Sequence, residues 1–444
     1  MRIGIVGAGL SGLSTAFYLK RLRPQTELVI FEAGARAGGT MQTHVIDGFQ
    51  FEAGGNGFLT NKPDCLQLVR DSGLELDLLP SSAEARKRYL FHDRLDRLPE
   101  SPPEFLASTL LSWPQKLRVL AEPLIPARRD AYDETVREFG DRRLGAAFTS
   151  TFLDAMCAGI YGSTPDRLSV LAAFPLVVAL EREHGGLLRG MLAKRKRDAG
   201  PGGVLTSFRG GLSTLARHLS SVIEAEWRWS SAVRRIERRE RGYRVFDDPA
   251  GTDVDAVAVC APAHAAAPML ENLDAAIAER LLRIEYTPIA IVGFGFRTHP
   301  NAFDGFGVLT TTGSRLPILG VLWDSSVFPG RAPPGSRSLR VLIGGQRNPE
   351  LARQDDSGLI QTARAGLAAV MGADPDPDVT FVHRWDRGIP AYAPGHVENV
   401  EQLFGVLARW PGLHLACNAY RGVAMNDCVR NGRLLAERLA AETG

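Results

Sequence analysis

A glycine-rich turn near the start of the chain constrains its fold more than any other feature. An apolar strand, a GxGxxG turn, a helix, a second apolar strand and an acid follow one another at residues 3–6, 7–12, 13–22, 27–31 and Glu32. This order is typical of the βαβ unit that binds a dinucleotide, and it predicts a Rossmann-like α/β domain. The same glycine spacing without flanking strands would indicate no more than a tight turn.

Each glycine of the turn has a predicted task. Gly7 lets the backbone turn tightly, Gly9 lets a pyrophosphate approach the N-terminus of the helix, and Gly12 lets the helix pack on the strand. Glu32, twenty residues after Gly12, is placed to accept hydrogen bonds from an adenosine ribose, and its charge disfavours the 2′-phosphate of NADP. NAD and FAD remain. The contacts predicted from this unit are Gly7, Ala8, Gly9, Leu10, Ser11, Gly12 and Glu32.

Two further glycine clusters bear on the choice between NAD and FAD. The first is EAGARAGGT at residues 32–40, and the second is FEAGGNG at residues 51–57. The first resembles the ExxxRxGG extension of the flavin amine oxidase superfamily. That resemblance implies FAD, with the first cluster along its pyrophosphate and the second at its flavin ring, which glycine backbone can approach closely. The contacts it implies are Ala33, Arg36, Gly39, Thr40, Gly54, Gly55, Asn56 and Gly57.

The C-terminal end carries a third piece of the same pattern. Residues 413–416 are predicted to form a strand, residues 418–425 a glycine-containing turn and residues 426–439 an amphipathic helix. A helix N-terminus beside a flavin can stabilise negative charge on the reduced ring. The superfamily resemblance implies that this end meets the N-terminal unit. It places Val423, Ala424 and Met425 against FAD, and also Val233 on a strand predicted over residues 232–236.

Over nearly its whole length the chain resembles the protoporphyrinogen oxidase family. The resemblance rests on the order and spacing of many short matches, because each alone is weak. One departure lies at Gly55, where the family commonly has proline; the loss of a proline enlarges the unfolded ensemble and leaves the contacts in place. The matching stretches are residues 87–91, 101–103, 142–145, 159–162, 168–169, 208–212, 305–307, 328–329, 389–392, 395–396 and 418–428.

The resemblance implies an activity and a substrate site. The reaction is the six-electron oxidation of protoporphyrinogen IX to protoporphyrin IX in haem biosynthesis, in which FAD takes hydride three times and O2 reoxidises it to give hydrogen peroxide. Arg88 is expected to bind a propionate, because its planar guanidinium matches a carboxylate. No residue is assigned as the base, and no metal is expected. The remaining substrate contacts implied are Asn56, Gly159, Phe306 and Leu309.

Three other functions remain open at this point. Coproporphyrinogen III, with four carboxylates, is an alternative substrate that would favour a more cationic pocket. Amine oxidation on the same scaffold is less favoured, because those enzymes commonly carry a lysine near the flavin in their later half and residues 197–444 contain none. A non-catalytic flavoprotein or porphyrin carrier is the third.

The amino-acid composition limits which binding partners and cellular locations are expected. The 52 basic and 50 acidic side chains give a formal charge of +2, which does not indicate nucleic acid. The five cysteines show no metal-ligand or disulfide spacing, and no apolar stretch reaches the roughly 18 residues of a spanning helix. With no secretory leader visible, we expect a cytoplasmic protein. The basic segment at residues 189–197 could contact the inner face of a membrane, and the family resemblance implies a homodimer.

The predicted architecture is α/β: a Rossmann-like FAD-binding domain, a sheet-rich substrate domain and an inserted helical lobe. The FAD domain is expected from three separate parts of the chain, because its motifs lie at both ends and in the middle. The predicted divisions are 1–85, 204–290 and 395–444 for the FAD domain, 86–203 for the helical lobe and 291–394 for the substrate domain.

Overall fold

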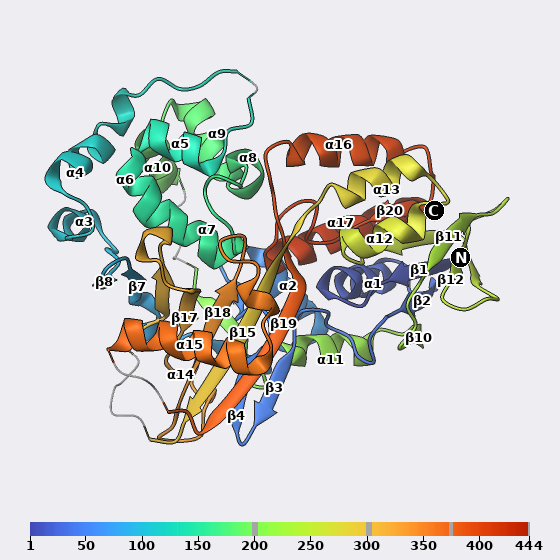
Figure 1. Ribbon diagram of the computed structural model, residues 1–444. Helices are drawn as coiled ribbons and strands as arrows, with labels where there is room; N and C mark the ends of the chain where they lie inside the picture. The colour runs from blue at the N-terminus through green and yellow to red at the C-terminus, as the bar shows by residue number, and fades with distance from the viewer. Residues whose placement is uncertain (131, 198–202, 299–303, 373–375, 443–444) are drawn as a thin grey trace.

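The computed structural model describes residues 1–130, 132–197, 203–298, 304–372 and 376–442, and for residues 194–197 it describes the backbone alone. A five-stranded sheet forms the core of one end of the molecule (Figure 1), and every neighbouring pair of its strands is parallel. In spatial order the strands are β10 (Glu226–Arg228), β2 (Glu27–Phe31), β1 (Arg2–Val6), β14 (Ala256–Val259) and β20 (Leu413–Leu415).

Helices cover both faces of this sheet, as the hydrophobic pattern of β2 requires. Leu28 and Ile30 enter one core and Val29 and Phe31 the other, because successive side chains of a strand point to opposite faces. The first core is covered by α1 (Leu10–Leu22), α2 (Pro63–Ser72), α11 (Ser213–Val222) and α17 (Met425–Glu442). The second is covered by α12 (Ala263–Leu270), α13 (Ala275–Leu282), α16 (His396–Leu407) and the sheet β11 (Arg235–Arg238), β12 (Tyr243–Phe246) and β13 (Thr252–Val254).

The two ends of the chain meet in this domain. Helix α17 packs along α1 (Figure 1), and a Cβ on Gly432 would lie 2.8 Å from the Ser11 carbonyl oxygen, so glycine permits the close approach. Several predicted boundaries were wrong by a few residues. Helix α1 begins at Leu10 instead of residue 13, directly after the glycine turn. Strand β20 ends one residue early and α17 begins one residue early.

A seven-stranded sheet forms the second large unit. Its neighbours are antiparallel except for β7 and β16, which run parallel. Helix α15 (Asp356–Met371) covers one face. In spatial order the strands are β19 (Val379–Pro390), β15 (Tyr286–Phe296), β18 (Arg337–Gly344), β17 (Ile318–Leu322), β16 (Gly307–Thr310), β7 (Arg88–Phe91) and β8 (Leu95–Arg97). Residues 88–97 therefore pair with this sheet, although the predicted lobe began at residue 86; the domain division itself stays a prediction.

A hairpin of the N-terminal part packs on the other face of the seven-stranded sheet. Cβ atoms on Gly293 and Gly295 of β15 would lie 2.5 Å and 2.8 Å from the rings of Phe51 and Phe49 respectively, so the glycines leave room for these rings. The hairpin is β3 (Thr43–Ile46) and β4 (Phe49–Glu52), and a third small sheet contains β5 (Phe58–Leu59), β9 (Leu205–Phe208) and β6 (Leu78–Pro80).

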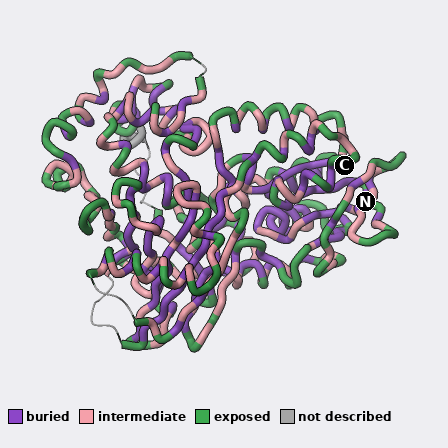
Figure 2. Tube along the Cα trace, viewed as in Figure 1, coloured by how far each residue is buried: buried purple, intermediate pink, exposed green. Residues whose placement is uncertain are grey.

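The inserted segment is helical and has its own hydrophobic core. Figure 2 shows buried segments inside this lobe and exposed segments along its outer helices. Within the described residues no helix has both the length and the apolar character of a membrane span. The lobe helices are α3 (Pro102–Ala107), α4 (Trp113–Leu120), α5 (Val136–Arg143), α6 (Ala146–Phe148), α7 (Asp154–Tyr161), α8 (Val170–Ala173), α9 (Pro175–His184) and α10 (Leu187–Arg197).

Short helical turns complete the chain. One of them, η4, is a π-helical turn that leads into α7. The turns are η1 (Glu75–Asp77), η2 (Glu84–Arg86), η3 (Glu122–Leu124), η4 (Thr149–Leu153), η5 (Thr312–Ser314), α14 (Asp324–Val327) and η6 (Leu351–Arg353).

Candidate FAD and substrate site

The turn between β1 and α1 has the shape that a pyrophosphate requires. Gly7 has a φ of +102°, which side chains with a Cβ rarely allow. A Cβ on Gly12 would lie 2.0 Å from the Gly7 carbonyl oxygen, whereas a Cβ on Gly9 would meet no atom within 4 Å. The turn is thus packed on the side of Gly12 and open at Gly9. The first N–H groups of a helix have no partners within the helix, so this open side suits an anion.

The other residues of this unit contribute mainly backbone. Leu10 and Ser11 are buried in the first turn of α1, so their N–H groups and not their side chains are available to a ligand. The Glu32 carboxylate accepts hydrogen bonds from the Ala8 N–H at 2.7 Å and the Gly34 N–H at 2.8 Å, which holds it beside the turn. A carboxylate has about four acceptor positions, so capacity remains for ribose hydroxyls.

The two later glycine clusters lie against each other. A Cβ on Gly54 would lie 2.2 Å from the Thr40 carbonyl oxygen, and a Cβ on Gly39 would lie 3.4 Å from the Gly9 Cα, so both clusters continue the surface of the first turn. Gly55 is exposed. A Cβ on Gly57 would meet the Thr206 carbonyl oxygen at 2.4 Å, so this glycine serves packing against β9. Ala33 and Arg36 are exposed near Glu32.

The C-terminal turn borders a cavity of about 570 Å³. Val423 and Ala424 line it from the FAD domain, while Ile160 and Tyr161 line it from the helical lobe. Met425 is the first residue of α17, so the turn leads into a helix N-terminus as predicted. The cavity therefore joins the expected flavin turn to the lobe that carries Gly159.

Val233 was placed on a strand by prediction, and that placement was wrong. Strand β11 begins at Arg235, and Val233 lies in the preceding loop, where its side chain is buried in the second core of the FAD domain. The loop is tied to the cofactor region, because the Ser231 N–H donates to the Glu32 carbonyl oxygen at 2.8 Å. Contact between Val233 and FAD stays a prediction.

Four of the predicted substrate residues come together: Arg88, Phe306, Leu309 and Gly159. Arg88 pairs with Gly307 across β7 and β16, and its guanidinium lies 5.4 Å from the centre of the Phe306 ring. A Cβ on Gly159 of α7 would lie 2.9 Å from Leu309 Cδ2, so the helix approaches the sheet through this glycine. Arg88 is exposed, and within the described residues its guanidinium forms no ion pair. It is available for a carboxylate of a ligand.

Asn56 is held by a buried arginine that the motifs do not reveal. Arg340, which is 1% exposed, donates to Asp324 through Nε at 2.6 Å and Nη2 at 2.8 Å, and to Asn56 Oδ1 at 2.9 Å. It also donates to the carbonyl oxygens of Glu52 and Gly54. Burial lowers the pKa of Arg340, but Asp324 outweighs that effect and the pKa is raised.

This contact sets the direction of the Asn56 amide. Arginine only donates, so the Asn56 oxygen must face Arg340 and the Nδ2 group must face away. Within the described residues the buried Nδ2 atom has no hydrogen-bond partner. A buried unpaired donor is costly, so an acceptor on a ligand beside the glycine loop fits this position.

Sequence patterns could not reveal Arg340 or Asp324. They lie more than 260 residues after the loop that they hold, and neither belongs to a recognised motif. An arginine in an otherwise apolar strand, SLRVLIG at residues 338–344, is the one available signal, because a buried arginine requires partners. Within the described residues no group of three or more His, Cys, Asp or Glu side chains could hold a metal ion.

Comparison with known proteins shows to which family the chain belongs. Residues 10–440 match the family described as flavin containing amine oxidoreductase. The chain belongs to this family. It is 30% identical to the coproporphyrinogen III oxidase of Bacillus subtilis (strain 168), over 97% of this chain and 96% of that protein. It is also 30% identical to the chloroplastic protoporphyrinogen oxidase of Oryza sativa subsp. japonica, over 96% of this chain and 85% of that protein.

A solved structure supports the same relationship. A protein from Exiguobacterium sp. 255-15, provisionally named a protoporphyrinogen oxidase, superposes with a TM-score of 0.87 at 27% identity and covers 99% of both chains. The resemblance inferred from the motifs, the α/β fold and FAD as the cofactor are thereby confirmed. The glycine cradle, the open position at Gly9 and the unpaired Asn56 donor all fit that cofactor.

Replacing Arg340 with lysine tests its effect on the loop. Lysine keeps the charge but cannot hold Asp324 and Asn56 in one plane. We expect the free energy of unfolding of Arg340→Lys to fall by about 2 kcal/mol and FAD to dissociate more readily, measured by thermal unfolding and by flavin fluorescence. Arg337→Lys on the same strand is the control, because among the described residues the Arg337 guanidinium bonds only the Ser336 carbonyl oxygen. Equal FAD affinity in the two variants would contradict the role.

Proposed function

We propose that this flavoprotein oxidises a porphyrinogen to the corresponding porphyrin. The observation that carries the proposal is the convergence of the Arg88 guanidinium, which forms no ion pair within the described part of the chain, with the apolar side chains of Phe306 and Leu309. Helix α7 closes on them through Gly159. A porphyrinogen is a large apolar macrocycle with peripheral carboxylates, and it requires apolar walls with a fixed cation. The names of the relatives support the same substrate class.

The residues have separate roles in this proposal. FAD, when bound, supplies the hydride acceptor. Arg88 binds a propionate, and Phe306 and Leu309 cover the macrocycle and exclude water. Asn56 donates through Nδ2 to an acceptor at the boundary between cofactor and substrate, with Arg340 as its positioning residue. Aromatisation removes six electrons and six protons, so three rounds with O2 would release three molecules of hydrogen peroxide.

Two other functions are less well supported. Amine oxidation remains disfavoured by the absence of lysine from residues 197–444. A porphyrin carrier would need no cofactor cradle, and the cradle around Gly7, Gly9 and Gly12 is intact. A non-catalytic flavoprotein would keep that cradle, and it is distinguished by the absence of hydrogen peroxide release. The predicted homodimer and cytoplasmic location stay predictions.

The two porphyrinogens can be distinguished by direct assay. The sequence favoured protoporphyrinogen IX, whereas the bacterial relative, which aligns over nearly its full length, is named for coproporphyrinogen III. We expect the FAD-loaded protein to oxidise coproporphyrinogen III with the higher kcat/KM, measured by porphyrin fluorescence with hydrogen peroxide counted in parallel. Exclusive turnover of protoporphyrinogen IX would reverse the choice. A stable flavin spectrum without peroxide release on either substrate would contradict the proposed function.

Removing the cation tests the substrate site. Arg88→Ala should mainly raise KM, with a loss of about 1–3 kcal/mol in kcat/KM, because one charge-assisted contact disappears. Steady-state kinetics on the better porphyrinogen measure it. Arg86→Ala is the matched control, since Arg86 is exposed two residues away and lies before β7. Unchanged kinetics in Arg88→Ala would remove Arg88 from the site.

We also propose that the helical lobe contacts a membrane surface. Most of the basic cluster at residues 189–197, on which this prediction rested, has side chains outside the described residues. Helix α4 offers separate support. Trp113, Leu117 and Leu120 lie on one face at helical spacing and are 63%, 60% and 48% exposed, and Leu124 follows at 80%. An exposed apolar stripe of this kind suits an interfacial helix.

Flotation with lipid vesicles tests the membrane contact. Replacing Leu117 with glutamine should weaken binding to vesicles of phosphatidylcholine and phosphatidylglycerol about tenfold, because burying one leucine contributes about 1.5 kcal/mol. Leu76→Gln is the control, since Leu76 is 93% exposed and lies in the FAD domain. Equal loss in both variants, or no flotation of the unmodified protein, would contradict a docking role for α4.

A further inference from the structure

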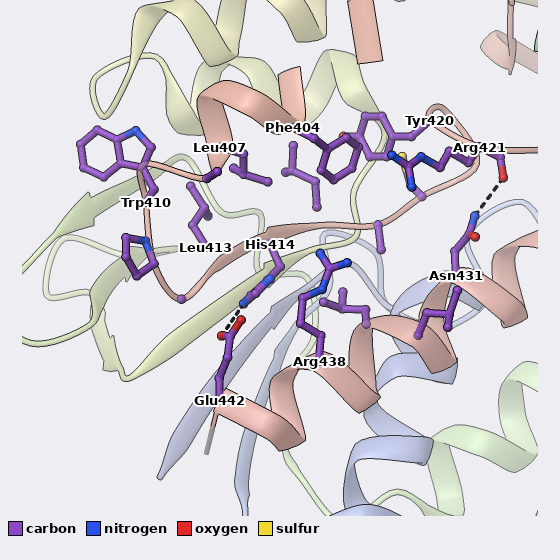
Figure 3. A pocket seen from close by; sticks show the side chains of 18 residues that line it. Phe404, Leu407, Trp410, Leu413, His414, Tyr420, Arg421, Asn431, Arg438 and Glu442 are labelled. Atoms are coloured by element: carbon purple, nitrogen blue, oxygen red, sulfur yellow. Dashed lines mark hydrogen bonds and ion pairs between the residues drawn. The ribbon is translucent and has the colours of Figure 1, made fainter. Parts of the chain in front are cut away.

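A second pocket lies at the edge of the FAD domain (Figure 3). It has a volume of about 380 Å³ and lies over β20, the last strand of the five-stranded sheet. Leu413 and Leu415 of β20 are buried beneath it. Phe404 of α16 and Leu434 of α17 line its sides. The pocket therefore has an apolar floor and apolar walls, and it is built from three elements of the C-terminal part.

Two guanidinium groups reach this pocket from different elements. Arg421 comes from the turn before α17 and Arg438 from α17 itself, and Figure 3 shows both side chains directed toward the pocket. Among the described residues neither forms an ion pair. Arg421 lies over Phe404, 5.1 Å from the ring centre. Two unpaired arginines beside apolar surface form a place where an anion is favoured.

The single carboxylate among the lining residues does not neutralise these arginines. Glu442 bonds with His414 Nε2 at 3.0 Å instead (Figure 3). The backbone at Arg421 is fixed from the other side, because Asn431 Nδ2 donates to the Arg421 carbonyl oxygen at 2.9 Å. The charged end of the pocket is therefore positioned by a local hydrogen bond and retains positive charge.

The pocket is separate from the cavity at the flavin turn. Tyr420 and Arg421 border both spaces, whereas Val423 and Ala424 line only the larger cavity. Arg88 is in neither lining set. A ligand in this pocket would therefore share the wall formed by Tyr420 and Arg421 with the larger cavity, but it would not contact Arg88.

We propose that this pocket binds a small organic anion, with a carboxylate or phosphate head group on an apolar body. The head group pairs with Arg421 and Arg438. The apolar body covers Leu413, Leu434 and the ring of Phe404. Charge-assisted hydrogen bonds to two guanidinium groups orient the head group, and burial of the body supplies further affinity.

Calorimetry on the full-length, FAD-loaded protein tests the class of ligand. The probes are 3-phenylpropionate, its uncharged amide 3-phenylpropanamide, and inorganic phosphate. We expect 3-phenylpropionate to bind, its amide to bind at least tenfold more weakly, and phosphate to bind more weakly than 3-phenylpropionate because it has no apolar body. Equal binding of the amide would overturn the role of charge, and equal binding of phosphate would overturn the role of the apolar surface.

Substitutions test where on the protein 3-phenylpropionate binds. Arg421→Gln and Arg438→Gln should each raise the Kd of 3-phenylpropionate at least tenfold. Arg433→Gln on the same helix should leave it unchanged, since Arg433 pairs with Glu437 and does not line the pocket. Arg88→Gln should leave the binding that depends on Arg421 unchanged, which separates this site from the proposed porphyrinogen site. The flavin spectrum and melting temperature verify that each variant is folded. Loss of binding in Arg88→Gln, or unaltered binding in both pocket variants, would overturn the proposal.

Discussion

Arg340 connects the cofactor loop to the substrate sheet through a buried cluster of charges. It lies on β18 of the seven-stranded sheet, yet its hydrogen bonds reach Asn56 and the carbonyl oxygens of Glu52 and Gly54. Asp324 supplies the matching carboxylate. Nearby, burial raises the pKa of Glu52 even though Arg331 opposes the change. Buried ion pairs contribute little net stability, but losing one partner is costly, so the cluster fixes one arrangement of loop and sheet.

Close packing around glycine lets this arrangement form. Gly12 and Gly432 allow α1 and α17 to lie against their neighbours, and Gly293 and Gly295 leave room for the aromatic rings of the β3–β4 hairpin. At Gly9, by contrast, the space in front of the backbone is open. Glycine therefore has two roles here. Its missing Cβ lets helices, strands and aromatic rings pack closely, and at Gly9 it leaves the backbone accessible to a cofactor.

The proposed chemistry depends on surfaces that separate domains supply. The cavity near Val423 and Ala424 is also lined by Ile160 and Tyr161 of the helical lobe. Arg88 and Leu309, which do not line this cavity, come from neighbouring strands of the second sheet. A large macrocycle with charged edges needs this combination of an apolar wall and a peripheral cation. The segment from Tyr420 to Ala424 borders two spaces, which are the pocket at Arg421 and the cavity at Val423 and Ala424.

The sequence by itself determined the dinucleotide fold, because local glycine geometry and strand periodicity leave a readable pattern. The order of its short motifs carried the resemblance to the family, and that resemblance implied FAD. It also indicated Arg88, Phe306, Leu309 and Gly159, which the structure brings together. It misplaced Val233 by starting a strand at Ala232, three residues before β11 begins at Arg235, since residue type does not mark where strand pairing begins. Only the tertiary structure decided that Arg340 and Asp324 hold Asn56 and that Arg421 and Arg438 share a pocket. These contacts join positions far apart in the chain, and no local pattern encodes them.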